Sequence, residues 1–223
     1  MHGLPGEGRG ALNLLSVDTS VGLAQAVVDL PRGAVKAVLA IGHGAGGDIE
    51  APDLVGLTNA AVAAGVAVVR VRQPYRVAGR RAPAPARQLD AAWTDTVRAL
   101  AAGDPPFQAS ARRLRDRPLV VAGRSSGARV ACRTATACGA TGVVALAFPL
   151  HPPGKPEKSR ADELCTDRPL LVVQGDRDAF GRPEEFPTAV NLIAVAGADH
   201  ALKAAAFNQA AARVVDWIAT LTR

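Results

Sequence analysis

Short apolar runs alternate with amphipathic stretches along this chain of 223 residues. Valine-rich runs of about four to eight residues are typical of parallel strands buried on both faces, and longer amphipathic stretches are typical of covering helices. We expect strands near residues 23–29, 35–41, 66–71, 118–122, 142–148, 169–174 and 190–195. We expect helices near residues 52–64, 87–102, 126–138 and 203–222. The alternation predicts an α/β fold with a mostly parallel central sheet and helices on both faces.

Two of the expected helices carry apolar stripes at helical spacing, which predicts that these residues face the core. In the helix near 203–222 the stripe consists of Phe207, Ala211, Val214, Val215, Ile218 and Leu221. In the helix near 87–102 it consists of Leu89, Trp93, Val97 and Leu100. We expect residues 1–223 to form one domain. Only about 20 residues separate the strand that ends near Phe148 from the next one at Leu170, which leaves no room for a cap domain.

The charge balance is positive, with a net charge of +6 at pH 7. Arginine supplies 22 of the 26 basic residues, and the arginines are scattered without the interleaved aromatic residues that single-strand binders use for stacking. We therefore expect no nucleic-acid partner. One local cluster surrounds a proline-rich segment, and we interpret it as a solvated loop, with anion binding as the alternative. Its members are Arg70, Arg72, Arg76, Arg80, Arg81 and Arg87.

Nothing in the sequence predicts a membrane span or a metal site. No segment reaches the roughly 18 consecutive apolar residues that cross a bilayer. Residues 1–7 show no basic region followed by an apolar core, so we expect no signal peptide and a cytoplasmic location. The three cysteines have no metal-type spacing, and Cys132 and Cys138 are expected to be small buried thiols. The third cysteine is Cys165.

The most informative motif is Gly-x-Ser-x-Gly, formed by residues 123–127. A valine-rich run leads into it and a helix-compatible segment follows at once, which is the strand–turn–helix context of a nucleophile elbow. Gly123 and Gly127 suit a turn so sharp that side chains there would collide with neighbouring backbone. The central residue of such a turn exposes its hydroxyl, so we identify Ser125 as the candidate nucleophile. Ser126 is expected to pack locally.

A serine nucleophile needs a base, and the base needs an orienting acid. Asp178 follows the strand near 169–174, at the sheet edge where open α/β sheets bind their ligands. His200 lies on a loop between the next strand and the last helix. Serine, acid, histidine is the order of the α/β-hydrolase triad. We prefer Asp178 to Asp176, because it lies further beyond the strand, and we expect Asp199 to be a solvated loop residue.

The strand near 35–41 is followed by the glycine-rich segment 42–47, which matches neither a P-loop nor a dinucleotide fingerprint. Such a loop can turn a backbone N–H toward a developing oxyanion, and the predicted donors are the amides of Ala45 and Ser126. His43 is expected to support this loop, and His151 to line the pocket, because neither follows the acid as the triad order requires. The predicted substrate-binding residues are His43, Gly44, Tyr75, Arg124 and His151.

Together these segments resemble small α/β-hydrolases of the lidless, dienelactone-hydrolase-like group. More narrowly, the chain resembles bacterial relatives of the hydrolase-like domain of a chromatin-complex subunit and a testis-expressed protein. The matching segments are 42–47, 73–76, 79–81, 123–127, 148–157, 175–181 and 197–200. The resemblance implies an α/β-hydrolase fold with Ser125, Asp178 and His200 as triad. Dienelactone hydrolases carry a cysteine nucleophile, which this chain lacks, so their substrate is not implied.

The sequence thus predicts a serine hydrolase that cleaves carboxylic esters or thioesters through an acyl-enzyme. Without a cap, little apolar surface can enclose a long acyl chain, so we expect small or short-acyl substrates. The segments 74–87 and 151–157 are the candidate walls. Their arginines and Lys155 suggest tolerance for a polar or anionic leaving group, with plain solvated charges as the alternative. We expect a small-molecule ester as the partner, with no metal or organic cofactor. The alternative is a catalytically idle scaffold that binds protein partners.

Overall fold

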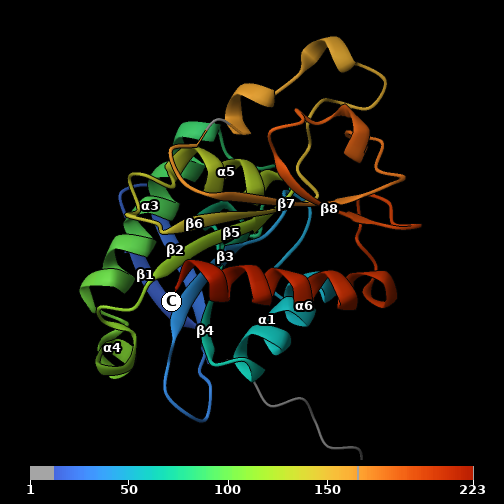
Figure 1. The fold of residues 1–223 in the computed structure, drawn as a ribbon. Coiled ribbons are helices and arrows are strands. Elements are labelled where there is room, and N and C mark those ends of the chain that lie inside the picture. The colour runs from blue at the N-terminus through green and yellow to red at the C-terminus, as the bar shows by residue number, and fades with distance from the viewer. Residues whose placement is uncertain (1–12, 165, 223) are drawn as a thin grey trace, which may run out of the picture.

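The computed structural model describes residues 13–164 and 166–222. In this part of the chain eight strands form one sheet (Figure 1). The strands are β1 (Leu15–Thr19), β2 (Gly22–Asp29), β3 (Ala37–Gly42), β4 (Val66–Arg72), β5 (Leu119–Arg124), β6 (Gly142–Leu146), β7 (Leu170–Gly175) and β8 (Asn191–Val195). The predictions for residues 1–7 and for Cys165 lie outside the described residues.

The sheet has the strand order β1-β2-β4-β3-β5-β6-β7-β8. All pairs from β4 to β8 are parallel, whereas β2 pairs antiparallel with both β1 and β4. The carboxyl ends of the parallel strands therefore lie along one edge, and the turn between β1 and β2 lies at the same edge. Gly42 of β3 pairs with Val71 of β4 and with Gly123 of β5, so the loops that follow these three strands start at one level.

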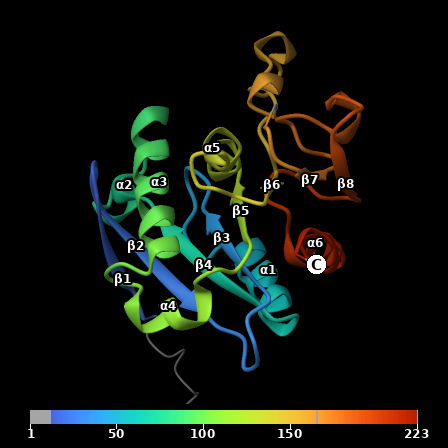
Figure 2. The ribbon, with the colours of Figure 1, turned by 60° about the vertical axis from the view of Figure 1, so that its left-hand side comes forward.

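Helices cover both faces of the sheet. The helices are α1 (Pro52–Ala63), α2 (Pro74–Val77), α3 (Ala86–Ala102), α4 (Gln108–Leu114), α5 (Ser126–Thr134) and α6 (Ala204–Leu221). Figure 2 shows α1 and α6 on one face and α3, α4 and α5 on the other. Each face buries its own apolar core, one built around Trp93 and Phe148 and the other around Ile41 and Phe207. The predicted α/β architecture is confirmed.

The sequence pattern locates every strand except β1, and it misses two short helices. The alternation in β1 extends over only five residues at the sheet edge, too few for a clear period. The helix α2 is a single turn, and α4 buries only Leu114, so neither has an amphipathic stripe. The stripes predicted for α3 and α6 are confirmed, since Trp93, Val97, Val214 and Ile218 are almost fully buried.

The segment between β6 and β7 contains only two short 3₁₀ helices in its described residues, η1 (Pro156–Lys158) and η2 (Ala161–Leu164). The fold therefore has no cap domain, as the spacing predicted. Cys132 and Cys138 are free, buried thiols, also as predicted, and burial raises the pKa of Cys132 to about 12. Among the helices of the described chain, none has the length and apolar character that crossing a membrane requires.

The predicted solvated arginine loop is partly wrong. Arg80 and Arg81 are exposed, as expected. Arg70, however, is 5% exposed, because it lies within β4 rather than on the loop. Its guanidinium pairs with Asp29 at 3.1 Å and donates to the carbonyl oxygen of Ile49 at 2.9 Å. Arg70 is close in sequence to the loop arginines, but β4 carries its side chain into the protein.

Candidate active site

Ser125 lies on a sharp turn between the end of β5 and the start of α5. Its backbone has φ 53° and ψ −113°, a conformation that residues other than glycine rarely adopt. Two glycines permit the turn. A Cβ on Gly123 would overlap the backbone of Gly127, and a Cβ on Gly127 would lie 2.7 Å from the carbonyl oxygen of His43. The hydroxyl of Ser125 does not cap α5, so it is available for other partners.

Ser125, His200 and Asp178 form one chain of hydrogen-bonding distances. Oγ of Ser125 lies 2.9 Å from Nε2 of His200, and Nδ1 of the same ring lies 2.8 Å from Oδ2 of Asp178. A carboxylate can only accept, so Nδ1 carries the proton and a neutral ring keeps its lone pair on Nε2. The serine hydroxyl is then placed to donate to Nε2. The structure thus brings together the three residues that the sequence singled out.

The carboxylate of Asp178 is fully buried and each oxygen is hydrogen-bonded. Oδ1 accepts the backbone N–H of Phe180 at 2.8 Å, and Oδ2 accepts the side-chain amide of Gln174 at 2.9 Å. The same amide donates to the carbonyl oxygen of Gly181 at 2.8 Å. A buried carboxylate without such donors would be strongly destabilised. Gln174, near the end of β7, therefore holds the acid and its loop in one orientation.

The other two candidate acids lie in different surroundings. Asp176 is exposed, although it is only two residues from Asp178. Asp199 is also exposed, and its Oδ1 accepts the backbone N–H of Ala201 at 2.9 Å within a turn. The geometry therefore supports the choice of Asp178 over Asp176.

Two further contacts hold His200 in place. The ring of Phe180 packs on the imidazole, with 4.3 Å between centroids and 33° between planes. The backbone carbonyl of His200 accepts a hydrogen bond from Nη2 of Arg124 at 2.8 Å. Nε of Arg124 lies 3.0 Å from Oδ2 of Asp53, which is 2% exposed at the start of α1. Arg124 thus ties the histidine loop to α1.

The loop after β3 is organised by His43, which is 3% exposed. The backbone N–H of Gln73 lies 3.1 Å from Nε2 of His43, and an N–H can only donate. Nε2 is therefore unprotonated, and Nδ1 donates to the carbonyl oxygen of Gly44 at 2.8 Å. Burial lowers the pKa of His43, which favours this neutral ring at pH 7. His43 supports the glycine-rich loop by hydrogen bonding, as the sequence reasoning expected.

This network fixes the direction of the Ala45 amide. The carbonyl of Gly44 accepts a second hydrogen bond, from the N–H of Gly47 at 3.0 Å. In a trans peptide unit the carbonyl and the following N–H point to opposite sides, so holding the Gly44 carbonyl also aims the Ala45 N–H. The hydroxyl of Tyr75 donates to the Ala45 carbonyl at 2.9 Å. A Cβ on Gly44 would lie 3.4 Å from Cβ of Ser125, so the loop lies against the serine turn.

Ser126 contributes a second backbone donor beside Ser125. It is the first residue of α5, and the first N–H groups of a helix have no acceptor within the helix. The positive end of the helix dipole adds to the attraction for negative charge. The amides of Ala45 and Ser126 therefore belong to two elements that meet at Ser125.

His151 lies beyond β6 and contacts the segment that follows Asp178. Its Nδ1 is 2.9 Å from the carbonyl oxygen of Pro152, and its Nε2 is 2.9 Å from Oε2 of Glu185. Both contacts favour the protonated ring, and the Pro152 carbonyl is the main cause of a raised pKa of His151. The backbone N–H of His151 also donates to the carbonyl of Phe180 at 3.0 Å.

Several residues assigned to substrate binding from the sequence have partners within the protein. His43, Tyr75 and Arg124 each hydrogen-bond to loop backbone around Ser125. Their contact with substrate stays a prediction. Sequence reasoning missed Gln174, although a polar residue at the end of the apolar run 170–173 was a signal for it. Sequence reasoning also missed Asp53. Its position at the start of a helix does not indicate that it pairs with a distant arginine.

Comparisons with known proteins agree with the fold. A model of the alpha/beta hydrolase domain family matches residues 35–216. A lidless α/β serine hydrolase from Xanthomonas campestris is 22% identical, with a TM-score of 0.67 over 95% of this chain and 94% of that one. A dienelactone hydrolase from Anabaena variabilis is 18% identical, with a TM-score of 0.70 over 95% of this chain and 98% of that one. An esterase from Pyrobaculum calidifontis is 16% identical, with a TM-score of 0.69 over 95% of this chain and 84% of that one. A search of curated protein sequences finds no match.

The ion pair between Arg124 and Asp53 gives a testable prediction for stability. Replacing Arg124 with Met leaves the Asp53 carboxylate buried without its partner, so we expect the free energy of unfolding to fall by about 3 kcal/mol at pH 7. Burial already raises the pKa of Asp53, so its charged form is the costly one. The loss should therefore shrink as the pH falls and Asp53 becomes protonated. Urea unfolding at several pH values measures it.

Two further variants control this experiment. Adding Asp53→Asn to Arg124→Met removes the unpaired charge and should recover at least half of the lost stability. Arg129→Met removes a half-buried arginine of α5 whose partner Glu163 keeps a second arginine, Arg133. We expect it to cost less than about 1 kcal/mol. An Arg124→Met effect no larger than that of Arg129→Met would contradict the role given to the buried pair.

Proposed function

Because this chain belongs to the alpha/beta hydrolase domain family, we propose that it is a serine hydrolase that cleaves small carboxylic esters or thioesters. The observation that carries the proposal is the continuous path from Oγ of Ser125 through the ring of His200 to Oδ2 of Asp178, with steps of 2.9 and 2.8 Å. These distances are those at which a general base can take a proton from a nucleophile. The serine hydrolase and esterase neighbours support the same reaction class.

The first step is attack on the substrate carbonyl. Nε2 of His200 removes the proton of the Ser125 hydroxyl while Oγ forms a bond to the carbonyl carbon. The imidazolium that results has N–H groups at both nitrogens, and Asp178 accepts the one at Nδ1. Because the carboxylate of Asp178 is already held by Gln174 and Phe180, it stabilises this charge without rearranging.

The carbonyl oxygen becomes negatively charged in the tetrahedral intermediate. The N–H groups of Ala45 and Ser126 are the proposed donors to this oxyanion. Both belong to backbone that is fixed before substrate arrives, the first by His43 and Tyr75 and the second by α5. Preorganised donors of this kind contribute about 3–4 kcal/mol each to transition-state stabilisation.

The intermediate then collapses to an acyl-enzyme. His200 transfers its proton from Nε2 to the leaving alcohol or thiol as the bond from the carbonyl carbon to that group breaks. A water molecule next attacks the acyl carbon and gives a proton to Nε2, and the return of that proton to Oγ releases the carboxylic acid. These steps use only the substrate, water and the residues named above.

The reactivity of Ser125 gives the first functional prediction. A fluorophosphonate should form one covalent adduct on Ser125, because its hydroxyl lies within reach of a base. Oγ displaces fluoride from phosphorus, and the neighbouring amides stabilise the phosphonylated product. Intact-mass and peptide mapping identify the labelled residue. The variant Ser125→Ala should not react, and Ser126→Ala should react at nearly the rate of the parent protein.

Failure of the parent protein to react, under conditions that label a control esterase, would favour the idle scaffold. An adduct on Ser126 would show that the assignment of Ser125 as the nucleophile is wrong.

The choice of acid gives a second prediction. Replacing Asp178 with Asn supplies an amide where Nδ1–H needs an acceptor, so we expect kcat for 4-nitrophenyl acetate to fall by about 10⁴-fold. Asp176→Asn is the matched control, because Asp176 is exposed two residues away, and it should change kcat less than threefold. Equal losses in the two variants would contradict the assignment.

Substrate size gives a third prediction. The described segment between β6 and β7 forms only short 3₁₀ helices, so no cap encloses a long acyl chain above Ser125. We expect kcat/KM for 4-nitrophenyl esters to be highest for acyl groups of about two to four carbons, because buried methylenes stabilise binding only where apolar walls exist. A steady rise of kcat/KM to acyl chains of ten carbons would show that an acyl tunnel exists.

A further inference from the structure

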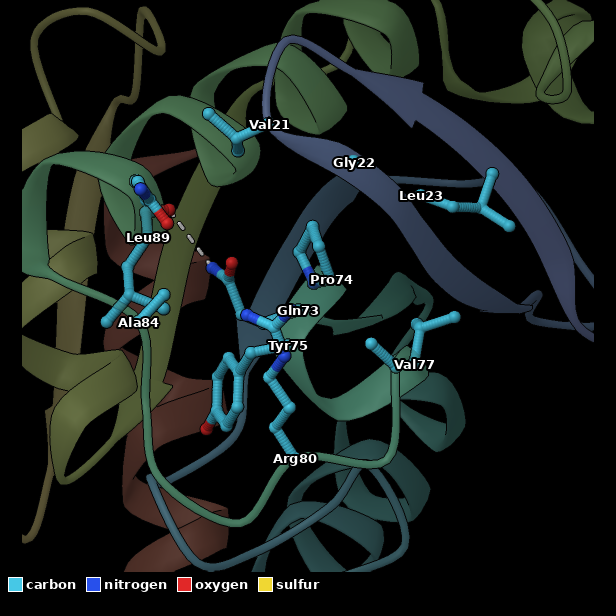
Figure 3. A pocket seen from close by; sticks show the side chains of 12 residues that line it. Val21, Gly22, Leu23, Gln73, Pro74, Tyr75, Val77, Arg80, Ala84 and Leu89 are labelled. Carbon is cyan, nitrogen blue, oxygen red and sulfur yellow. Dashed lines mark hydrogen bonds between the residues drawn. The ribbon is translucent and has the colours of Figure 1, made fainter.

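A cavity of about 230 Å³ lies beside the proposed reaction centre and takes no part in the mechanism above. It opens between the turn that joins β1 to β2, the short helix α2 and the start of α3 (Figure 3). Its volume is below the roughly 300–1,000 Å³ of sites for drug-sized ligands, so it suits a molecule built on a single ring.

The cavity is separate from Ser125. Gln73, on its wall, lies two residues beyond Val71, and Ser125 lies two residues beyond Gly123. Val71 and Gly123 both pair with Gly42 of the intervening strand β3, so the two loops are two strand spacings apart, about 10 Å. Tyr75 stands between them: its ring lines the cavity and its hydroxyl bonds to the carbonyl of Ala45.

Most of the cavity wall is apolar. Its apolar lining includes Val21, Leu23, Pro74, Ala84 and Leu89 (Figure 3). Val21 and Leu23 are 38% and 42% exposed, and they are two of the three large apolar residues that the described chain exposes. An apolar body in the cavity would cover part of this surface, which is now in contact with water.

One hydrogen-bond acceptor in the wall has no partner within the protein. The side chain of Gln73 is 6% exposed, and its Nε2 donates to the carbonyl of Leu89 at 3.1 Å. Its Oε1 is buried without a hydrogen-bond partner. Figure 3 shows the amide end of Gln73 pointing into the space between Val21, Pro74 and Leu89. A buried acceptor that lacks a donor costs free energy, so this atom selects a ligand with an O–H or N–H group.

A cation completes the cavity. Arg80 lines it, and in Figure 3 its side chain extends from the loop toward Tyr75. Arg80 takes part in none of the ion pairs found among the described residues. The cavity lining within residues 13–164 and 166–222 also contains no aspartate or glutamate. The guanidinium is therefore available to a carboxylate of the ligand.

We propose that this cavity is a second binding site, which takes a small ring-sized carboxylate that carries a hydroxyl or N–H donor. The apolar body lies between Val21 and Leu89, the donor bonds to Oε1 of Gln73, and the carboxylate pairs with Arg80. This site is distinct from the one that holds the ester at Ser125, and binding there does not depend on hydrolysis.

Isothermal titration of the Ser125→Ala variant with 4-hydroxybenzoate tests the proposal without interference from hydrolysis. We expect a dissociation constant below about 1 mM. Benzoate lacks the donor and 4-hydroxybenzamide lacks the charge, so each should bind at least fivefold more weakly. Equal affinity for the three compounds, or no binding at 10 mM 4-hydroxybenzoate, would overturn the assignment.

Three further variants in the Ser125→Ala background locate the site. Ala84→Phe fills the cavity from a partly exposed loop position and should abolish binding. Arg80→Gln should weaken binding of 4-hydroxybenzoate at least tenfold, because a hydrogen bond to a charged group is lost. Arg81→Gln is the matched control: Arg81 is an exposed neighbour outside the cavity lining, and its loss should change affinity less than twofold.

Two results would contradict this location. Undiminished binding to Ala84→Phe would place the ligand elsewhere. Equal losses for Arg80→Gln and Arg81→Gln would show general attraction to a basic loop instead of a built site. Because the titration uses a protein without Ser125, its outcome is independent of whether the proposed esterase activity exists.

Discussion

The close approach of three backbone segments at the serine turn is the constraint on which the site depends. β5, the start of α5 and the loop after β3 meet so closely that Gly123 and Gly127 leave no space for a Cβ. This contact allows Ser125 to be held at φ 53°, because the packed backbone on both sides leaves it no relaxed alternative. It also brings the glycine-rich loop against the serine, since that loop contributes the carbonyl of His43 that limits Gly127. The nucleophile and its proposed oxyanion donors are therefore positioned by the same packing.

A second close approach organises the acid and the base. A Cβ on Gly175, at the end of β7, would overlap the backbone around Ala198, so the loops after β7 and β8 lie against each other. The N–H of Arg177 donates to the carbonyl of Ala198 at 3.0 Å and joins the two loops. As a consequence, the side chains of Asp178 and His200 point from these loops toward each other. Because both contacts are between backbone atoms, the geometry of the site requires glycine at these few positions.

The fold and the three central residues could be predicted from sequence because each leaves a local signal. Buried strands appear as apolar runs, and Ser125, Asp178 and His200 each follow such a run at the sheet edge where the loops meet. Apart from Gln174, which ends its own apolar run, the residues that hold them leave no comparable signal. Arg124 is the last residue of its strand, where a substrate-binding residue would also lie, and only the folded chain shows that its guanidinium reaches Asp53 and the carbonyl of His200. Such partners are 71 and 76 positions away in sequence, and no local pattern encodes the pairing.

The same distinction separates polar groups that act on the protein from those left for a ligand. The sequence indicated Tyr75, His43 and Arg124 as substrate-binding residues, and each bonds to backbone near Ser125 and fixes a loop. Gln73 shows both behaviours, since its backbone N–H donates to His43 while its buried Oε1 has no donor within the protein. A polar residue beside a catalytic loop therefore indicates a ligand only once its hydrogen bonds within the protein are accounted for. By that criterion, Oε1 of Gln73 indicates a ligand more strongly than the guanidinium of Arg124 does, because Arg124 already has partners within the protein.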